Sequence, residues 1–479
     1  MLAFALERHP SVLYGATAMA SAAVGLMLVR AQGGAPVPMI ALGGLALLVL
    51  LVLLVSVPPP TLFVGWFFAA PLLAESTAAS SVGHVLMLVL YAFPALVLAC
   101  LTATHFGRNV SLTLTDFLPV AFAVYVVVSL SVASQLIELT LARTLLILFL
   151  NYLLGPCLYY FLIVGPGRLV ETSKLLLVLM VGACIQGVLA IVEHATHWNL
   201  WGSYHWNKLS GTRAVSTFAN PAILGVYLGI GTVIAVAILM WHPNAARPLR
   251  RTALLTVVVC PPGLLLTLTR APIAATAVAV VALLTLGRKR LAGFGIIAAA
   301  VVALVAAWPH LEGSSLYQNR VTDVETVLER QSLQEMSLEV AKQKPVLGWG
   351  LGSFGRAIAT VEPPYIAGLI DSANLSVSHN TFLSVLVELG GLGLLLLFVP
   401  FIVIGTKALA RARSSPADRW IVGAASGSLV VVMLTATAND YHYFSLVPAL
   451  SFVMLAILRR MTGDWSPHAD ITRPAHVAP

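Results

Sequence analysis

Charged residues are scarce in this chain: Asp, Glu, Lys and Arg make up 10% of its 479 residues, against about 25% in an ordinary soluble domain. Hydrophobic residues account for 59%, and this balance excludes a water-soluble globular protein. Lys and Arg outnumber Asp and Glu by 27 to 19, but they stand in short clusters between apolar segments and form no long basic stripe. We therefore expect no nucleic acid partner and interpret these clusters as membrane topology signals.

Cysteine and nucleotide-binding motifs are also sparse. The four cysteines all lie inside apolar runs and none forms a CxxC pair, so we expect core residues rather than metal ligands or disulfide partners. No Walker A pattern and no Asp-x-Asp pair occurs, which excludes the usual sites for ATP and for a metal-bound sugar nucleotide. We therefore expect no metal and no cofactor, and any reaction must use a substrate that was activated elsewhere.

Apolar runs near the roughly 20 residues that span a bilayer are abundant. They predict an all-α polytopic membrane protein with about 14 transmembrane helices, a range of roughly 12 to 14. Prolines near the start of two of the segments, 61–74 and 214–240, predict that these helices are broken or re-entrant. The expected segments are 11–29, 38–57, 61–74, 81–101, 117–135, 141–164, 172–192, 214–240, 252–269, 271–286, 291–308, 380–406, 420–437 and 443–458.

The distribution of Lys and Arg predicts the orientation. With the N-terminus in the cytoplasm, 17 of the 27 basic residues fall on the cytoplasmic side and 10 on the outer side. Both termini are then cytoplasmic, and we expect the first apolar run to be retained rather than cleaved as a signal peptide. The predicted organisation is N-terminal helices over 1–308 with a short outer loop at 193–213, a large outer loop at 309–379, C-terminal helices over 380–458 and a cytoplasmic tail over 459–479.

Two arginines are candidate phosphate ligands at the outer face. Arg270 stands between two apolar runs that leave almost no loop, so its guanidinium is confined to the membrane boundary, where it can bind phosphate oxygens through two hydrogen bonds. Arg213 lies where the loop 193–213 enters the membrane, and a pyrophosphate needs more than one cation in a partly dry site. The alternative for both is an arginine that anchors a helix end at the interface.

His379 and Asn380 lie where the large outer loop turns into an apolar helix. We expect Asn380 to cap this helix, which places His379 at the helix entrance, where a histidine can act as a general base near neutral pH. An ordinary capping or anchoring role is the alternative for His379. Glu388 falls on the opposite helix face, so we expect it to bond to a neighbouring helix rather than to pair with His379.

Two further patterns carry weaker signals. Trp206 in the short outer loop and Tyr441 in an outer turn can stack on sugar rings, although an interfacial aromatic belt is the commoner explanation. Residues 350–355 match GxGxxG literally, but a helix-like stretch rather than a strand precedes them. This context predicts a tight turn that docks the preceding helix onto the membrane domain, not a nucleotide site.

Three patterns in the C-terminal half match a known signature. They are Lys-Pro-Val-Leu-Gly-Trp-Gly-Leu-Gly-Ser-Phe at 344–354, Ser-His-Asn-Thr-Phe-Leu at 378–383 and Glu-Leu-Gly-Gly-Leu-Gly at 388–393. Together they resemble the O-antigen ligase and polymerase superfamily, over roughly 309–405. Arg213 and the Thr-Arg turn at Arg270 match the two outer-face arginines of this family more loosely, since many members carry Ser-Arg at that turn.

The resemblance implies a GT-C-like membrane glycosyltransferase in a bacterial inner membrane, with its active site facing the periplasm. It would transfer a glycan from an undecaprenyl-pyrophosphate-linked oligosaccharide to an acceptor hydroxyl without a metal. Arg213 and Arg270 would stabilise the developing pyrophosphate charge, and His379 would accept or position the proton of the acceptor hydroxyl. The residues to which we assign substrate contacts are Arg213, Arg270, Asn380, Arg356, Trp206 and Tyr441.

Within this family the acceptor stays open. A count of about 14 helices favours an O-antigen or exopolysaccharide polymerase, whose acceptor is another lipid-linked glycan. The alternative is a ligase that acts on lipid A-core. A transporter or flippase for the same lipid-linked glycan is a third reading, because it would bind pyrophosphate with the same arginines without breaking it; the lack of an evident internal repeat argues against it. Membrane lipid is an expected partner in every case.

Overall fold

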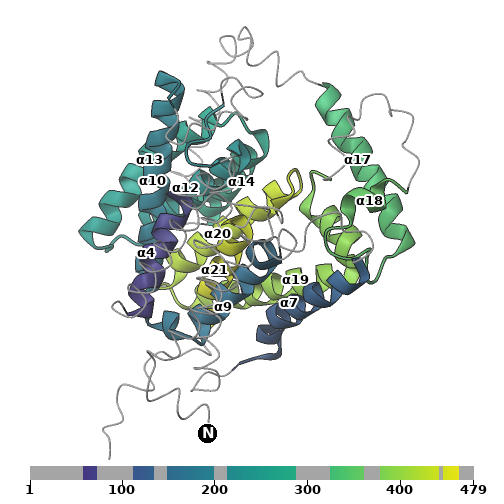
Figure 1. Ribbon diagram of the computed structural model, residues 1–479. Coiled ribbons are helices and arrows are strands. Elements are labelled where there is room, and N and C mark those ends of the chain that lie inside the picture. Colours follow the sequence, from purple (N-terminus) through teal and green to yellow (C-terminus); the bar gives the residue numbers. More distant parts are fainter. Residues whose placement is uncertain are drawn as a thin grey trace, which may run out of the picture.

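The computed structural model of the chain describes residues 58–72, 112–133, 148–198, 213–218, 220–286, 324–360, 378–441 and 446–462. Every regular element within these ranges is a helix (Figure 1). In chain order the elements are α4 (Pro59–Leu72), α7 (Leu114–Ala133), the π-helical turn η2 (Leu148–Leu153), α9 (Leu154–Ile163), the 3₁₀ turn η3 (Pro166–Leu169), α10 (Thr172–Thr196), α12 (Pro221–Trp241), α13 (Arg247–Leu266), α14 (Arg270–Leu286), α17 (Val324–Gln343), α18 (Phe354–Ile358), α19 (Thr381–Ser414), α20 (Arg419–Ala436) and α21 (Leu446–Arg460).

Each predicted apolar segment that falls within the described residues contains one or more of these helices. Segments 11–29, 38–57, 81–101 and 291–308 lie outside the described residues. Six described helices, α7, α10, α12, α13, α19 and α20, are long and apolar enough to cross a membrane. The all-α prediction is therefore confirmed for the described residues, whereas the count of about 14 spans is not. The segment 61–74, predicted as broken, is one continuous helix over its described part, α4.

The start of α12 corrects the prediction for segment 214–240. Residues 213–218 form turns, the helix begins only at Pro221, and from there it runs without a break. The side-chain oxygen of Asn220 caps it by accepting a backbone N–H of the first turn at 2.8 Å. Pro221 is tolerated at the first helical position because an N–H there would have no partner in the helix. Arg213 consequently lies in a turn and not on a helix face.

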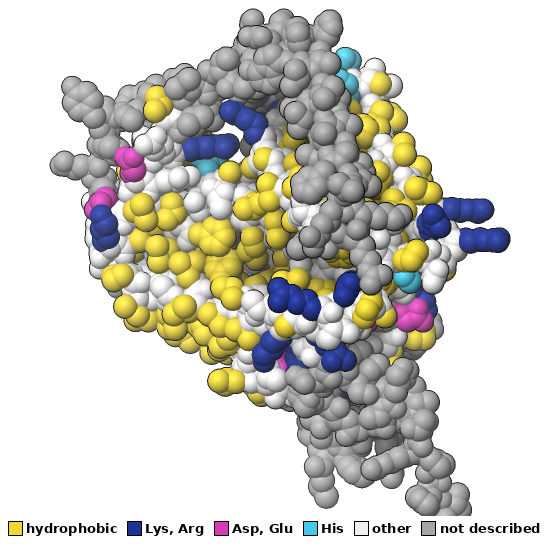
Figure 2. Space-filling model, turned by 180° about the vertical axis from the view of Figure 1, so that it is seen from behind, with side chains coloured by type: hydrophobic (Ala, Val, Ile, Leu, Met, Phe, Trp, Pro, Cys, Tyr) yellow, Lys and Arg dark blue, Asp and Glu magenta, His cyan; other side chains and the backbone are white. Residues whose placement is uncertain are grey.

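Helix α12 is enclosed by four other helices. It is buried along nearly its whole length, and α10, α13, α14 and α20 pack around it (Figure 1). Helices α7 and α13 instead expose apolar side chains such as Val124, Val128, Leu254 and Val258, which fits a lipid environment. Figure 2 shows a broad area of hydrophobic side chains bordered by groups of Lys and Arg.

Contacts between distant segments sort the helix ends into two groups. At one end, which we call the site end, the Ala214 N–H donates to the Leu266 carbonyl oxygen at 3.0 Å, so the start of the α12 segment meets the end of α13. At the opposite end, Arg459 at the end of α21 contacts Asp116 at the start of α7. The topology predicted from the apolar segments and from Lys and Arg also places the α12 start and the α13 end on one side, and the α7 start and the α21 end on the other. Which end faces the cytoplasm stays a prediction.

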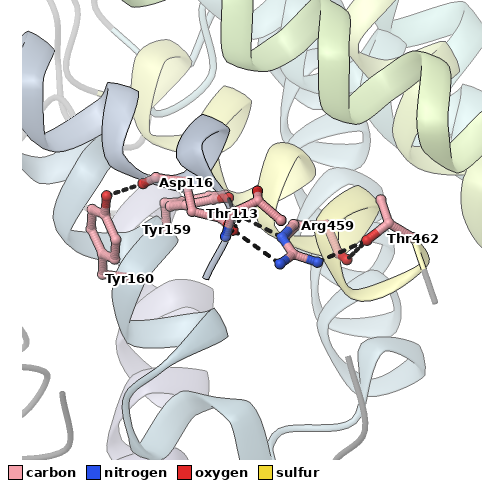
Figure 3. A network of polar contacts seen from close by, with 6 residues as sticks. All are labelled: Thr113, Asp116, Tyr159, Tyr160, Arg459 and Thr462. Carbon is pink, nitrogen blue, oxygen red and sulfur yellow. Dashed lines mark hydrogen bonds and ion pairs between the residues drawn. The ribbon is translucent and has the colours of Figure 1, made fainter. Parts of the chain in front are cut away.

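An ion pair is buried at the opposite end (Figure 3). Arg459 donates two hydrogen bonds to the Asp116 carboxylate, Nε to Oδ1 at 2.8 Å and Nη2 to Oδ2 at 2.9 Å, and their side chains are 4% and 0% exposed. The Tyr159 hydroxyl donates to Oδ1 at 2.6 Å and the Thr113 N–H donates to Oδ2 at 2.7 Å. Because the carboxylate is paired and fully hydrogen-bonded, its burial is tolerated, and it joins α7, α9 and α21.

Asp116→Ala is expected to destabilise the protein by about 3–5 kcal/mol, because it leaves the Arg459 guanidinium buried without its counter-charge. Thermal unfolding of the detergent-solubilised protein measures this loss. The matched control is Lys174→Ala, which removes an ion pair with Glu171 at 3.4 Å whose side chains are 63% and 64% exposed. Such an exposed pair contributes at most about 1 kcal/mol, so equal effects of the two substitutions would contradict the prediction.

The stretch before α19 contains two helices, α17 and α18, which stand together at one side of the bundle (Figure 1). On α17, the side chains of Leu333, Met336 and Val340 are buried. Met336 and Val340 pack in a cluster with side chains of α18 and α19. This confirms the helix predicted before the GxGxxG segment. The large loop predicted over 309–379 is therefore partly helical in its described part.

Residues 345–350, which lead into the GxGxxG segment, dock this helix pair onto α19 through backbone hydrogen bonds. The Gly350 N–H donates to the Glu388 carbonyl oxygen at 2.8 Å, and the Gly391 N–H donates to the Pro345 carbonyl oxygen at 2.7 Å. These bonds form where α19 is interrupted at Gly390, with φ 64° and ψ −171°, since a break in the helix frees backbone groups for other partners. The segment is thus a tight turn, as its context predicts.

Candidate functional site

Arg213 is hydrogen-bonded to the turn that joins α13 to α14. Its Nε donates to the Thr267 carbonyl oxygen at 3.0 Å and its Nη2 donates to Thr269 Oγ1 at 2.6 Å. The carbonyl groups at the end of α13 have no partner within that helix, and the helix dipole favours a cation there. Half-buried Arg213 is therefore held against the residues that immediately precede Arg270.

Arg270 is the first residue of α14 and is exposed. Its side chain makes no hydrogen bond or ion pair with any other residue that the structure describes. The helix dipole disfavours a cation at a helix N-terminus by about 0.3–1 kcal/mol, whereas it favours an anion. The Arg270 guanidinium, the start of α14 and the fixed Arg213 guanidinium thus concentrate positive charge and N–H donors at one place, which suits phosphate oxygens.

His379 precedes Asn380, the cap residue of α19, and has a left-handed backbone conformation, with φ 53°. Side-chain-bearing residues adopt this conformation rarely, and it persists where the surrounding structure fixes it. Here the backbone N–H of His379 donates to Asp440 Oδ2 at 2.6 Å. A hydrogen bond to an ionised carboxylate is stronger than one between neutral groups, so Asp440 can hold the backbone of His379 in place.

The Asp440 side chain joins α19 to the turn between α20 and α21. Its Oδ1 accepts the Ser384 hydroxyl at 2.7 Å and the Ser378 hydroxyl at 3.2 Å, and the residue is 5% exposed. Burial raises the pKa of the Asp440 carboxyl, and the hydrogen bonds from Ser384 and from the His379 N–H oppose this shift without cancelling it. The carboxylate thereby fixes the N-terminus of α19 to the neighbouring turn.

Asn380 caps α19, as its position in the sequence predicts. Its Oδ1 accepts two N–H groups of the first turn, at 3.0 and 3.3 Å. The next residue, Thr381, ties the same helix end to the α20–α21 turn. Its N–H and hydroxyl both donate to the Asn439 carbonyl oxygen, at 3.2 and 2.7 Å, and its Oγ1 accepts the Tyr441 N–H at 2.8 Å. The entrance of α19 is therefore rigidly held.

The predicted site residues form two groups at the site end. Arg213 bonds to the α13–α14 turn, after which Arg270 begins α14, and His379 and Asn380 lie just before the start of α19. The groups are linked through α14 and α20, which pack against each other: Arg270 begins α14, and Asp440 follows the end of α20. Figure 2 shows a hollow at one edge of the molecule where Lys or Arg side chains and a His side chain gather.

The remaining predicted substrate contacts are Arg356, Tyr441 and Trp206. Arg356 is exposed on α18, Tyr441 is only 3% exposed, and Trp206 lies outside the described residues. Their roles in substrate binding stay predictions. In the part of the chain that the structure describes, no group of three or more His, Cys, Asp or Glu side chains is placed to hold a metal ion.

Glu388 bonds to neighbouring elements, in agreement with its predicted role. Its Oε2 accepts the Tyr152 hydroxyl at 3.5 Å and its Oε1 accepts the Phe354 N–H at 3.3 Å. The side chain is fully buried. Glu388 therefore connects α19 to η2 and α18 and supports the docking of the polar stretch.

The site-end carboxylates of Asp440 and Glu193 were assigned no contact in the sequence analysis. The sequence points to the α20–α21 turn but assigns its role to Tyr441, whereas the neighbouring Asp440 makes the contact with His379. A carboxylate in a very short turn between two apolar helices is the signal that could have found it, since burial of such a group requires partners. Glu193 accepts hydrogen bonds from the turn that follows Arg213.

Comparison with known families identifies one segment. Residues 255–398 match the family model described as O-antigen ligase. The match covers less than half of the chain; it includes Arg270, Arg356, His379 and Asn380, and it leaves Arg213 and the α20–α21 turn outside. A search of curated proteins found no match.

Proposed function

We propose that the protein is a membrane glycosyltransferase that transfers a glycan from undecaprenyl pyrophosphate to an acceptor hydroxyl. The match of residues 255–398 to the family model described as O-antigen ligase supports this proposal. We assign the reaction to the site end and the site end to the periplasmic face of a bacterial inner membrane. The observation that carries the proposal is the hydrogen bonding of Arg213 to the turn that ends in Arg270. Two guanidinium groups at one helix N-terminus match the two phosphates of the leaving group.

The chemistry is a displacement at the first carbon of the glycan. The bond between this carbon and the pyrophosphate oxygen breaks, and a bond to the acceptor oxygen forms. Negative charge develops on the pyrophosphate, where Arg213 and Arg270 stabilise it. The acceptor hydroxyl gives its proton to His379 as general base, and Asp440 acts as a positioning residue through the His379 backbone. The electron pair of the broken bond leaves with undecaprenyl pyrophosphate.

The acceptor distinguishes a polymerase from a ligase. The preference for a polymerase rests on a count of about 14 helices, and the six candidate spans among the described residues do not support that count. The matched family description names a ligase. The proposal therefore includes both acceptors, another lipid-linked glycan or lipid A-core, and product analysis decides between them.

The test uses purified protein with an undecaprenyl-pyrophosphate-linked oligosaccharide, with and without lipid A-core, and resolves products by gel and mass spectrometry. Longer lipid-linked glycans from donor alone would establish a polymerase, and product only with added core would establish a ligase. A parallel reaction with EDTA is expected to proceed at the same rate. Donor binding without any glycosidic product would contradict the proposal of a glycosyltransferase and would support a transporter of the lipid-linked glycan.

His379→Ala is expected to lower turnover by about 100-fold or more, the usual contribution of a general base, with donor binding nearly unchanged. The reason is that His379 acts on the acceptor, whereas the arginines bind the donor. Single-turnover rates and donor affinity are measured separately. His194→Ala serves as the control, because His194 is exposed near the end of α10; equal turnover of the two variants would remove His379 from the mechanism.

A further inference from the structure

Two buried polar side chains of α10 face the turn that carries Arg213. Glu193 follows Gln186 by about two helical turns, so the two lie on the same face of the helix. Glu193 is 7% exposed and Gln186 is 0% exposed. Polar groups buried in an apolar helix bundle need hydrogen-bond partners, and both side chains find them in residues 213–218.

The Glu193 carboxylate binds two consecutive backbone amides. Its Oε2 accepts the Val215 N–H at 2.9 Å and the Ser216 N–H at 2.7 Å. Ser216 has a left-handed backbone conformation, with φ 54°. Successive N–H groups in such a turn form a concave anion-binding site, and here the anion is a side chain of the protein itself. The backbone two and three residues beyond Arg213 is thereby fixed to α10.

Gln186 holds the same turn from a position about two helical turns earlier on α10. Its Oε1 accepts the Ser216 hydroxyl at 2.5 Å, and its Nε2 donates to Thr217 Oγ1 at 2.6 Å and to the Pro71 carbonyl oxygen at 3.1 Å. The turn is consequently tied to both α10 and α4. At its other end, the Arg213 side chain is tied to Thr269, so the position of Arg213 depends on contacts at both ends of the turn.

We infer that Glu193 positions Arg213 for binding of the pyrophosphate group, an inference that rests on the proposed function of Arg213. Arg213 Nη2 meets Thr269 Oγ1 at 2.6 Å, and this contact requires the backbone to stay where Glu193 holds it. Loss of the carboxylate leaves the Val215 and Ser216 amides unpaired, and the turn must then shift to find other partners. A shift of about 1 Å in a group that binds the reacting substrate costs on the order of 100-fold in rate.

The test is a double-mutant cycle with Arg213. Glu193→Ala is expected to lower kcat/KM for the lipid-linked donor by about 100-fold, whereas Glu193→Gln, which keeps an acceptor oxygen for the amides, should retain most of the activity. In an Arg213→Ala background, Glu193→Ala should cause no further loss, because its effect acts through Arg213. Val192→Ala is the matched control, since this exposed neighbour lies on the same helix.

Binding of undecaprenyl pyrophosphate to each variant is measured alongside transfer. Weaker binding by Glu193→Ala than by wild type supports the inference even if no variant makes a glycosidic product. The absence of product would contradict only the proposed function. Equal losses in the wild-type and Arg213→Ala backgrounds would overturn the inference. If Glu193→Ala does not fold, the cycle is run with Glu193→Gln, whose weaker acceptor should lower binding only when Arg213 is present.

Discussion

Arg270→Ala is expected to lower the rate of glycan transfer by about 100- to 1,000-fold, the cost of removing one preorganised group that stabilises developing charge. The fold should not suffer, because the Arg270 side chain is exposed and bonds to no other described residue. Removal of a cation from the start of α14 even relieves an unfavourable interaction with the helix dipole. Loss of function with retained stability is therefore the signature of a residue that binds substrate.

The measurement combines transfer rates with the amount of folded protein after purification in detergent. Arg270→Lys should recover part of the activity, since lysine keeps the charge but cannot bind two phosphate oxygens in the fork geometry of arginine. Arg251→Ala is the control: Arg251 is an exposed arginine near the start of α13, at the opposite end of the bundle. A drop in folded protein for Arg270→Ala, or full activity, would favour the role of a helix anchor.

Gly390→Ala is expected to destabilise the protein by about 4 kcal/mol or more, a magnitude reserved for strained or overpacked sites. Gly390 has a φ of 64°, and a Cβ there would lie 2.3 Å from the Val346 carbonyl oxygen and 2.6 Å from the Gly348 backbone nitrogen. Because these are backbone atoms, they cannot rotate away. The added methyl group would push residues 346–348, which lead into the GxGxxG segment, away from α19. Helices α17 and α18 would then lose their attachment to α19.

The matched control is Gly405→Ala on the same helix, where no atom lies within 4 Å of an added Cβ. Alanine in a helix interior is more favourable than glycine by about 0.5–1 kcal/mol, so this variant should be as stable as wild type or more so. Thermal unfolding and limited proteolysis of residues 324–360 measure both variants. Equal stability of the two would show that the break in α19 is not required for docking.

The helices were predictable because burial in lipid leaves a signal in composition. Every predicted apolar segment that the structure describes contains a helix, and the Asn380 cap follows from the side-chain chemistry of that position. The break at Gly390 was not predictable, because it depends on a partner segment more than 30 residues away in the chain. For the same reason hydropathy placed the start of α12 too early: apolar side chains in residues 214–218 are buried in a turn and not on a helix.

The candidate site also has features that the sequence predicts and features that depend on packing. Topology alone places Arg213, Arg270 and His379 at one membrane face, since it counts helix crossings. The hydrogen bond from Arg213 to Thr269 and the contact of His379 with Asp440 could not be foreseen, because both join residues brought together only by packing. The buried pair of Asp116 and Arg459 is the extreme case, since its members are 343 positions apart in the chain.

The central claim is that pyrophosphate is the leaving group of a glycosyl transfer at the site end. The most direct test quantifies, in one reaction, the undecaprenyl pyrophosphate that is released and the glycosidic bonds that form, with wild-type protein and with Arg270→Ala. The account predicts equal amounts of the two products in wild type and formation of both about 100- to 1,000-fold slower in the variant. Release of pyrophosphate lipid without new glycosidic bonds, or new bonds at the same rate in Arg270→Ala, would contradict it.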